Sequence, residues 1–279
     1  VLILGENAAI TKTIKYAQEE KFDFICSENN REILSFYKDA GFENVFWSPG
    51  LNFRKLSQPL RLSPLNKIVF NGTVGELNSY SFKCLNALQK NGIAINLSNC
   101  NPEEAAALYS KSLISLNCSI NGELNNKVYE VLASGGFLLT DRLSGNSGLE
   151  ILFRNERHFK AFSTPSELVE LAKFYLNNQQ EAISISRAGL KQFNKIFSYE
   201  KCASRFLNFI FNKKIEEPFQ IKPRAKTKVN CTNEYETLKK VQFEKPGLKV
   251  SLSENLKNVL ADKVQSLYRL NFNDSQSTE

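Results

Sequence analysis

The sequence predicts an α/β protein: a Rossmann-like parallel sheet, with the remnant of a second Rossmann-like domain before it and a helical extension after it. Three observations support this. Short apolar segments recur about every 20 to 26 residues between positions 66 and 176. A segment with helical length and periodicity lies between successive apolar segments, and Asn-Gly or Gly-Gly turns end several of them. Strands that alternate with helices at this spacing form a parallel sheet of βαβ units.

The expected elements follow in order along residues 66–212. Five strands are expected, at 67–70, 93–97, 113–116, 137–140 and 160–162. Helices are expected at 77–90, from Pro102, at 127–134 and from Pro165 to about Leu176. Asn101 is an N-cap before Pro102, and Thr164 to Glu167 is a capping box. Two further helices, at 180–193 and 199–212, are expected to pack on the same domain.

The flanking segments differ from this pattern. Residues 1–50 hold patterns for two strands and a helix, at 22–26, 45–47 and 31–40. Fifty residues cannot bury a domain's sheet, so we interpret 1–50 as the end of an incomplete N-terminal domain and 51–65 as an interdomain connector. Residues 213–279 are expected to form a basic linker, an amphipathic helix over 253–270 and a polar tail. The lack of methionine, even at position 1, indicates a fragment.

Composition excludes several classes of function. No apolar run approaches the ~20 residues of a membrane-spanning helix, and no secretory signal opens the chain. The net charge of +7 is densest at 213–228, which we interpret as a solvated linker because a nucleic-acid site would interleave aromatic residues. The 6 scattered cysteines, none in a Cys-x-x-Cys pair, and the single histidine indicate no metal site and favour a cytoplasmic setting.

Three loops are candidates for ligand binding, because open parallel sheets bind ligands at the carboxyl ends of their strands. These loops are 71–75, 117–126 and 141–148. Gly72 allows the backbone to approach a phosphate, and Lys127, at the start of a helix, can neutralise a pyrophosphate. Glu130, one turn further, can accept hydrogen bonds from both ribose hydroxyls. The alternative interpretation is tight turns and a helix-surface carboxylate favoured by the helix dipole.

One segment resembles the C-terminal half of GT-B glycosyltransferases: residues 126–141 are Asn-Lys-Val-Tyr-Glu-Val-Leu-Ala-Ser-Gly-Gly-Phe-Leu-Leu-Thr-Asp. The sequence is most similar to the glycosyl transferases group 1 type, including its spore-maturation-protein-like members. This similarity covers roughly residues 66–212, with further matching segments at 148–153, 166–168, 174–176, 188–189 and 198–201. In addition, residues 20–60 are similar to the end of the N-terminal domain of that fold.

The resemblance implies a hexosyl- or related transferase that binds a nucleotide-sugar donor and transfers the sugar to an unknown acceptor, whether glycan, protein or lipid-linked. The position of Glu130 holds the nucleotide ribose in that family, and the loop of Gly72 lies near the diphosphate. Lys127 stands where the family often has arginine, and the Gly135-Gly136 turn packs the helix against the next strand. The implied donor-binding residues are Gly72, Thr73, Lys83, Asn117, Asn126, Lys127, Glu130, Gly135 and Gly136. No metal or other cofactor is implied.

Departures from the family pattern concern catalysis. Many relatives have a second glutamate eight positions before the ribose glutamate, where this chain has Gly122. The neighbouring Glu123 is therefore the catalytic candidate. The subgroup often has an arginine on the helix after the first loop, and in this chain the cation closest to that position is Lys83. The single histidine, His158, contacts donor or acceptor in one interpretation and is a surface residue in the other. The single tryptophan, Trp47, is expected in the core near the hinge.

A second class of function stays open at this point. The same fold can serve as a non-catalytic scaffold that binds a nucleotide or a protein partner, with the basic linker and the helix at 253–270 as docking elements. Nucleic-acid binding through 213–228 ranks last, and it would show a steep dependence on salt concentration.

Overall fold

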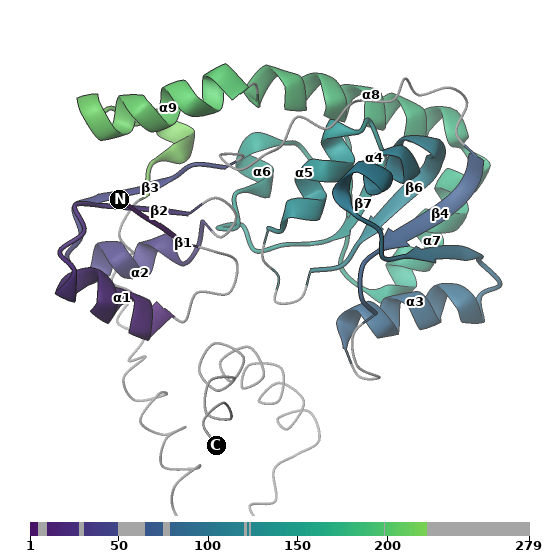
Figure 1. Ribbon diagram of the computed structural model, residues 1–279. Helices are drawn as coiled ribbons and strands as arrows, with labels where there is room; N and C mark the ends of the chain where they lie inside the picture. Colours follow the sequence, from purple (N-terminus) through teal and green to yellow (C-terminus); the bar gives the residue numbers. More distant parts are fainter. Residues whose placement is uncertain are drawn as a thin grey trace, which may run out of the picture.

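The computed structural model describes residues 1–4, 10–27, 31–49, 65–74, 79–119, 122, 124–197 and 199–221. Within these residues the chain forms two parallel sheets with helices on both faces (Figure 1). The connector expected at 51–65, apart from Leu65, and the helix expected at 253–270 lie outside the described residues. No helix in the described part of the chain is long and apolar enough to cross a membrane.

The larger sheet has five parallel strands in the order β5-β4-β6-β7-β8. They are β4 (Leu65–Asn71), β5 (Ile95–Ser98), β6 (Ser112–Asn117), β7 (Leu138–Asp141) and β8 (Lys160–Phe162). The five strands expected from the sequence are confirmed, although β5 begins at Ile95 and Ile93 is buried just before it. The chain adds β5 on one side of β4 and then returns to place β6 on the other side, so β4 and β6 flank a topological switch point.

The helices of the larger sheet are α3 (Tyr80–Lys90), α4 (Pro102–Lys111), α5 (Asn126–Ala133), α6 (Leu149–Leu152), α7 (Pro165–Asn177) and α8 (Gln179–Ile196). Helices α4 and α7 begin at the caps that the sequence predicts, whereas the helix expected at 77–90 begins at Tyr80, after its N-cap Ser79. The Asn101 side chain accepts a hydrogen bond from the Glu104 amide at 3.0 Å, and the Thr164 hydroxyl accepts one from the Glu167 amide at 3.1 Å. The single-turn helix α6 escapes the sequence analysis because four residues are too few to show a helical period.

Alternation along the strands divides the core of the larger sheet between its two faces. Ile68 and Phe70 of β4 pack on the side of α3 and α7, whereas Val69 packs on the side of α4 and α5. All three are at most 2% exposed. Successive side chains of a strand point to opposite faces, so a strand covered on both sides is apolar throughout. This explains why the sequence shows continuous apolar runs here and no alternation.

The smaller sheet has three parallel strands in the order β1-β2-β3. They are β1 (Leu2–Leu4), β2 (Phe24–Ser27) and β3 (Asn44–Trp47). Helices α1 (Ile10–Glu19) and α2 (Leu34–Asp39) lie on one of its faces (Figure 1). This sheet is the second Rossmann-like unit that the sequence predicts.

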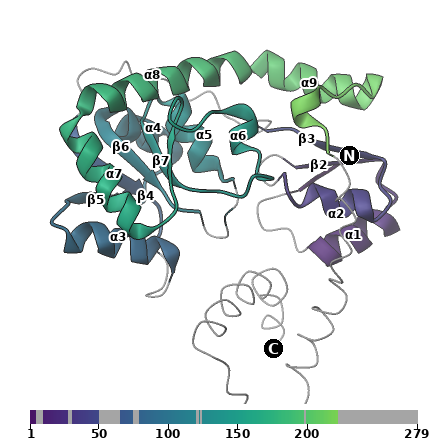
Figure 2. The same cartoon turned by 180° about the vertical axis from the view of Figure 1, so that it is seen from behind.

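Helix α9 (Tyr199–Asn212) covers the other face of the smaller sheet. In Figures 1 and 2, α8 and α9 follow one another along the top of the molecule, α8 over the larger sheet and α9 over the smaller one. The Phe209 ring of α9 lies 3.9 Å from the Phe46 ring of β3, centroid to centroid. The expectation that α9 packs on the domain of residues 66–212 is therefore wrong, because its apolar face matches Cys26 and Phe46 of the smaller sheet.

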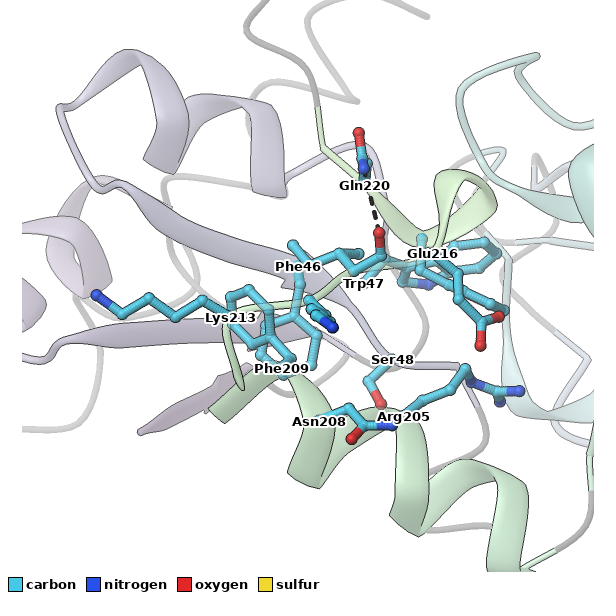
Figure 3. A pocket seen from close by; sticks show the side chains of 12 residues that line it. Phe46, Trp47, Ser48, Arg205, Asn208, Phe209, Lys213, Glu216 and Gln220 are labelled. Carbon is cyan, nitrogen blue, oxygen red and sulfur yellow. Dashed lines mark hydrogen bonds between the residues drawn. The ribbon is translucent and has the colours of Figure 1, made fainter. Parts of the chain in front are cut away.

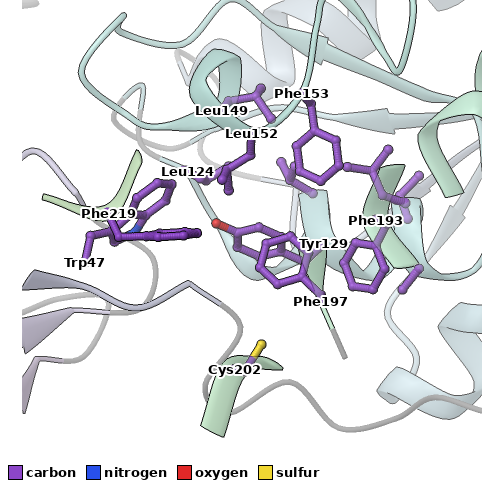
Figure 4. Packing of buried hydrophobic residues seen from close by; sticks show 14 of the residues in the cluster. Trp47, Leu124, Tyr129, Leu149, Leu152, Phe153, Phe193, Phe197, Cys202 and Phe219 are labelled. Atoms are coloured by element: carbon purple, nitrogen blue, oxygen red, sulfur yellow. The ribbon is translucent and has the colours of Figure 1, made fainter. Parts of the chain in front are cut away.

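Trp47, at the end of β3, joins the two sheets (Figure 4). Its indole is 1% exposed and lies against Gly148, the residue that precedes α6. The Phe219 ring, in the short 3-10 helix Glu217–Phe219, lies 6.1 Å from the Trp47 ring. One hydrophobic cluster therefore contains Val45 of the smaller sheet and Leu138 of the larger sheet. The predicted core position of Trp47 is confirmed.

Candidate functional site

Polar side chains end three neighbouring strands of the larger sheet. Asn71 ends β4, Asn117 ends β6 and Asp141 ends β7. All three side chains belong to buried residues. Because β4 and β6 flank the switch point, and open parallel sheets bind ligands at the carboxyl ends of strands beside such a point, this edge of the sheet is the candidate site.

Lys127 reaches from the start of α5 to the loop that follows β4. Its ammonium lies 5.2 Å from the centre of the Phe70 ring. Gly72 has a φ of 140°, and a Cβ at this position would overlap the Lys127 Nζ atom. A glycine is therefore required for the lysine to lie against this loop. The arrangement places a positive charge at the point where both the loop backbone and the first turn of α5 can meet an anion.

Glu130 lies one helical turn beyond Lys127, half-buried near the Tyr109 side chain of α4. Burial raises the pKa of the Tyr109 hydroxyl, and the nearby Glu130 charge raises it further. The neighbouring Asn71 side chain is fixed, because its Oδ1 accepts a hydrogen bond from the Cys100 amide at 3.0 Å. Glu130 is thus a carboxylate on the same side of the switch point as Lys127.

Asp141 fixes the loop that follows β6. Its Oδ1 accepts a hydrogen bond from the Ser119 amide at 2.8 Å and one from the Thr140 hydroxyl at 3.3 Å. Its Oδ2 accepts a hydrogen bond from the Ser119 hydroxyl, which in turn accepts one from the Gly122 amide at 3.0 Å. The carboxylate therefore ties the end of β7 to the loop that leads to α5.

Asn117 extends this network toward the helix. Its Nδ2 donates to the Thr140 hydroxyl at 3.0 Å, and its Oδ1 accepts a hydrogen bond from Asn125 Nδ2 at 3.3 Å. Asn125 is the residue before α5, which carries Lys127 and Glu130. The network therefore couples the ends of β6 and β7 to the position of both charged side chains.

The environment of Asp141 predicts a dependence of stability on pH. Burial raises the pKa of Asp141, although hydrogen bonds from Ser119 and Thr140 oppose the change. The folded state then holds the proton more tightly than the unfolded chain, where an aspartate has a pKa of about 3.9. This tighter proton binding adds to the free energy of unfolding. The added stability is complete below a pH of about 3.9 and is lost as the pH rises through the higher pKa of Asp141 in the folded state.

Asp141→Asn cannot ionise, so its stability should not show this loss. We expect the melting temperature of Asp141→Asn, relative to that of the native protein, to increase between about pH 4 and pH 7. Thermal unfolding followed by circular dichroism in a pH series measures the difference. Parallel curves for the two proteins would show that Asp141 ionises alike in the folded and unfolded states.

The structure brings Gly72, Asn117, Lys127 and Glu130 to one edge of the larger sheet. Thr73 follows Gly72 and is exposed, and Asn126 is the exposed first residue of α5. Lys83 is exposed on α3, in the second turn of the helix. Their roles stay predictions. Glu123 lies outside the described residues.

Gly135 and Gly136 are not part of this cluster. They follow the C-terminus of α5 and precede β7, so they lie at the opposite edge of the sheet. A Cβ at Gly136 would come within 3.0 Å of both Ser115 Oγ and Val131 Cγ1. This is the close packing of helix and strand that the sequence predicts. Both glycines therefore lie away from the carboxyl ends of the strands, where a donor is expected to bind.

His158 is buried rather than a surface residue, so the surface interpretation is wrong. It is 7% exposed, and its Nδ1 accepts a hydrogen bond from the Arg154 amide at 3.0 Å. Burial lowers its pKa, and the charges of Arg157 and Arg154 lower it further. His158 precedes β8, so it lies at the edge of the sheet opposite the site. A neutral imidazole that accepts a backbone hydrogen bond has a structural role here.

Sequence reasoning missed Asp141 and Ser119 as one hydrogen-bonded unit, and it missed Tyr109. The signal for Asp141 was present, since it ends an apolar strand in the same way as Asn71 and Asn117. Tyr109 gave no such signal, because a tyrosine within an apolar helix face is typical of a core residue. Among the described residues, no group of three or more His, Cys, Asp or Glu side chains could hold a metal ion.

One known protein family resembles part of this chain. Residues 74–208 match the sequence model of a family described as "Glycosyl transferase-like". This part of the chain is therefore similar to glycosyl transferase-like proteins, and its parallel Rossmann-like sheets have the fold of GT-B glycosyltransferase structures. No curated protein sequence matches the chain.

Several solved structures resemble this one at low sequence identity. HepE of Anabaena, in complex with UDP and glucose, is 10% identical with a TM-score of 0.54, and the match covers 73% of this chain and 66% of that one. TarM of S. aureus is 11% identical with a TM-score of 0.55, covering 72% and 45%. Sucrose-phosphate synthase of Thermosynechococcus elongatus is 11% identical with a TM-score of 0.51, covering 76% and 68%. The chain thus spans about half to two thirds of these proteins, and the likeness shows the fold.

Proposed function

We propose that this chain contains the donor-binding part of a glycosyltransferase that takes a nucleotide-sugar, with UDP as the favoured nucleotide. The observation that carries the proposal is the contact of Lys127 with Gly72, with Glu130 one turn further along α5. Two independent findings support it. Residues 74–208 match a glycosyl transferase-like family, and HepE, which has the same fold, is described in complex with UDP-glucose.

The proposed chemistry uses each group for one task. Lys127 and the amides at the start of α5 compensate the negative charge of the diphosphate, which increases when the bond between the anomeric carbon and the phosphate oxygen breaks. Glu130 accepts hydrogen bonds from the ribose hydroxyls and so fixes the nucleotide relative to the loop of Gly72. The acceptor, a glycan, a protein or a lipid-linked molecule, then attacks the anomeric carbon, and the nucleoside diphosphate leaves.

A second candidate function is a non-catalytic scaffold that docks a protein partner. Leu207 and Phe211 on α9 favour it, because they are one turn apart and 50% and 77% exposed. Large apolar side chains that are exposed together often mark an interaction surface. This candidate predicts a folded domain that does not respond to nucleotides.

A thermal-shift panel with UDP, GDP, ADP, UDP-glucose and UDP-N-acetylglucosamine separates the two functions. A ligand at about 1 mM with a Kd of about 10 µM adds ~2.7 kcal/mol to the free energy of unfolding, which raises the melting temperature measurably. We expect the uridine nucleotides to raise it and the others to leave it unchanged. A flat panel on a protein that still melts cooperatively would reject nucleotide-sugar binding by this chain and favour the scaffold.

A further inference from the structure

A pocket of about 540 Å³ lies between β3, α9 and the segment that follows α9 (Figure 3). Its lining residues include Phe46 and Ser48 from the end of β3, Asn208 and Phe209 from α9, and Phe219 from the 3-10 helix. None of its lining residues belongs to the cluster of Gly72, Lys127 and Glu130. Pockets of this volume accommodate small organic molecules.

The walls of the pocket are held by backbone interactions. Lys213 ends α9 with a positive φ of 51°, and its amide donates to the Phe209 carbonyl at 2.9 Å. The chain then turns back so that Gln220 forms an antiparallel bridge with Phe46. The Arg31 guanidinium donates to the Gln220 carbonyl at 3.0 Å. The pocket is therefore preformed, since both of its sides are fixed to the smaller sheet.

Two buried polar atoms at the pocket have no hydrogen-bond partner. Ser48 is 3% exposed and its hydroxyl is unpartnered, and Figure 3 shows that hydroxyl directed toward the Asn208 side chain on α9. The Nε of Arg205 is also buried and unpartnered. The rest of this guanidinium is fixed, because it donates to the Ile196 carbonyl at 3.0 Å and stacks 4.5 Å from the Phe219 ring. An unpartnered buried donor destabilises the folded state, and an acceptor atom of a ligand would satisfy it.

The charge and shape of the lining define the class of ligand. Arg205, Lys213 and Lys214 are positive, and Glu216 is negative, so the lining carries an excess of positive charge. Aromatic rings cover much of the remaining wall, including those of Phe46, Phe209 and Phe219. We propose that this pocket binds a small organic anion with a flat apolar body, whose carboxylate, sulfonate or phosphate oxygen accepts hydrogen bonds from Ser48 and Arg205.

Fluorescence titration with 8-anilinonaphthalene-1-sulfonate tests the proposal, because this dye combines an aromatic body with one sulfonate and brightens in apolar sites. We expect saturable binding at one site that UDP at about 1 mM does not displace. Asn208→Trp fills the pocket and should weaken binding about tenfold or more. Ser48→Ala should weaken it about fivefold, since one hydrogen bond is lost, while its melting temperature stays equal to or above that of the native protein.

Two controls make the result decisive. Leu207→Ser changes an exposed apolar residue of the same helix that does not line the pocket, and it should leave dye binding unchanged. N-phenyl-1-naphthylamine, the uncharged counterpart of the dye, should bind at least about fivefold more weakly, because it has no sulfonate to accept a hydrogen bond from Arg205. The proposal is overturned if the dye shows no saturable binding or if UDP displaces it. It is also overturned if Leu207→Ser weakens dye binding while Ser48→Ala does not, or if the neutral dye binds equally well.

Discussion

Replacing Glu130 by alanine is expected to raise the Kd for UDP by a factor of about 100 or more. A hydrogen bond to a charged group contributes about 1.5–3 kcal/mol, and the carboxylate is proposed to accept two from the ribose. The fold should survive the change, because Glu130 is only half-buried at the surface of α5. The measurement is a calorimetric titration with UDP, together with the thermal shift at saturating ligand.

The matched control for this variant is Glu170→Ala. Glu170 is an exposed glutamate on α7, a helix that packs against the other face of the larger sheet. It should leave the affinity for UDP unchanged. If Glu130→Ala also binds UDP like the native protein, Glu130 is a solvated helix residue favoured by the helix dipole, and the nucleotide site must be assigned elsewhere while the fold stands.

Gly148→Ala is expected to destabilise the protein by about 3 kcal/mol, the sum of two effects. Gly148 has a φ of 99°, a left-handed conformation that costs a residue with a Cβ about 1–2 kcal/mol. The new Cβ would also lie 2.7 Å from Trp47 Cζ2 and 2.9 Å from Trp47 Cζ3. Trp47 cannot move away easily, because it is 1% exposed and packs on Phe219.

Thermal unfolding measures this effect, and Gly145→Ala is its control. A loss of 3 kcal/mol lowers the melting temperature by roughly 6–12 °C in a protein of this size. Gly145 lies in the same loop with no atom within 4 Å of a Cβ and no positive φ, so its alanine variant should stay within about 1 kcal/mol of the native protein. Equal stability of the two variants would show that the indole does not hold the two sheets together at Gly148.

The contact of Trp47 with Gly148 also bears on the proposed function. GT-B structures combine two Rossmann-like units, and here one hydrophobic cluster includes residues of both sheets. Ser144, in the loop before α6, donates to Glu32 of the smaller unit at 3.4 Å. These contacts join the loop after β7 to the end of β3 and to the segment before α2, and Asp141, at the end of β7, connects the same loop to the proposed nucleotide site.

The sequence by itself determined the order of strands and helices in the larger sheet, apart from the short helix α6. Asn101 and Thr164 act locally as N-caps, and apolar runs such as 137–140 form strands covered on both faces. It also located the loops of the candidate site, because the carboxyl ends of parallel strands can be read directly from the order of strands and helices. These features depend on neighbours within a few residues, so a single sequence is enough to recognise them.

Only the tertiary structure decided the rest. In the folded chain Lys127 lies against Gly72, His158 is buried, and Asp141 is hydrogen-bonded to Ser119. Helix α9 packs on the smaller sheet, although the sequence predicts that it packs on the larger one. Each of these outcomes depends on segments far apart in the chain, and helical or strand periodicity identifies an apolar face without identifying its partner. The strand order that puts β4 beside β6 is set by how all these faces are buried together, and that order is what creates the site.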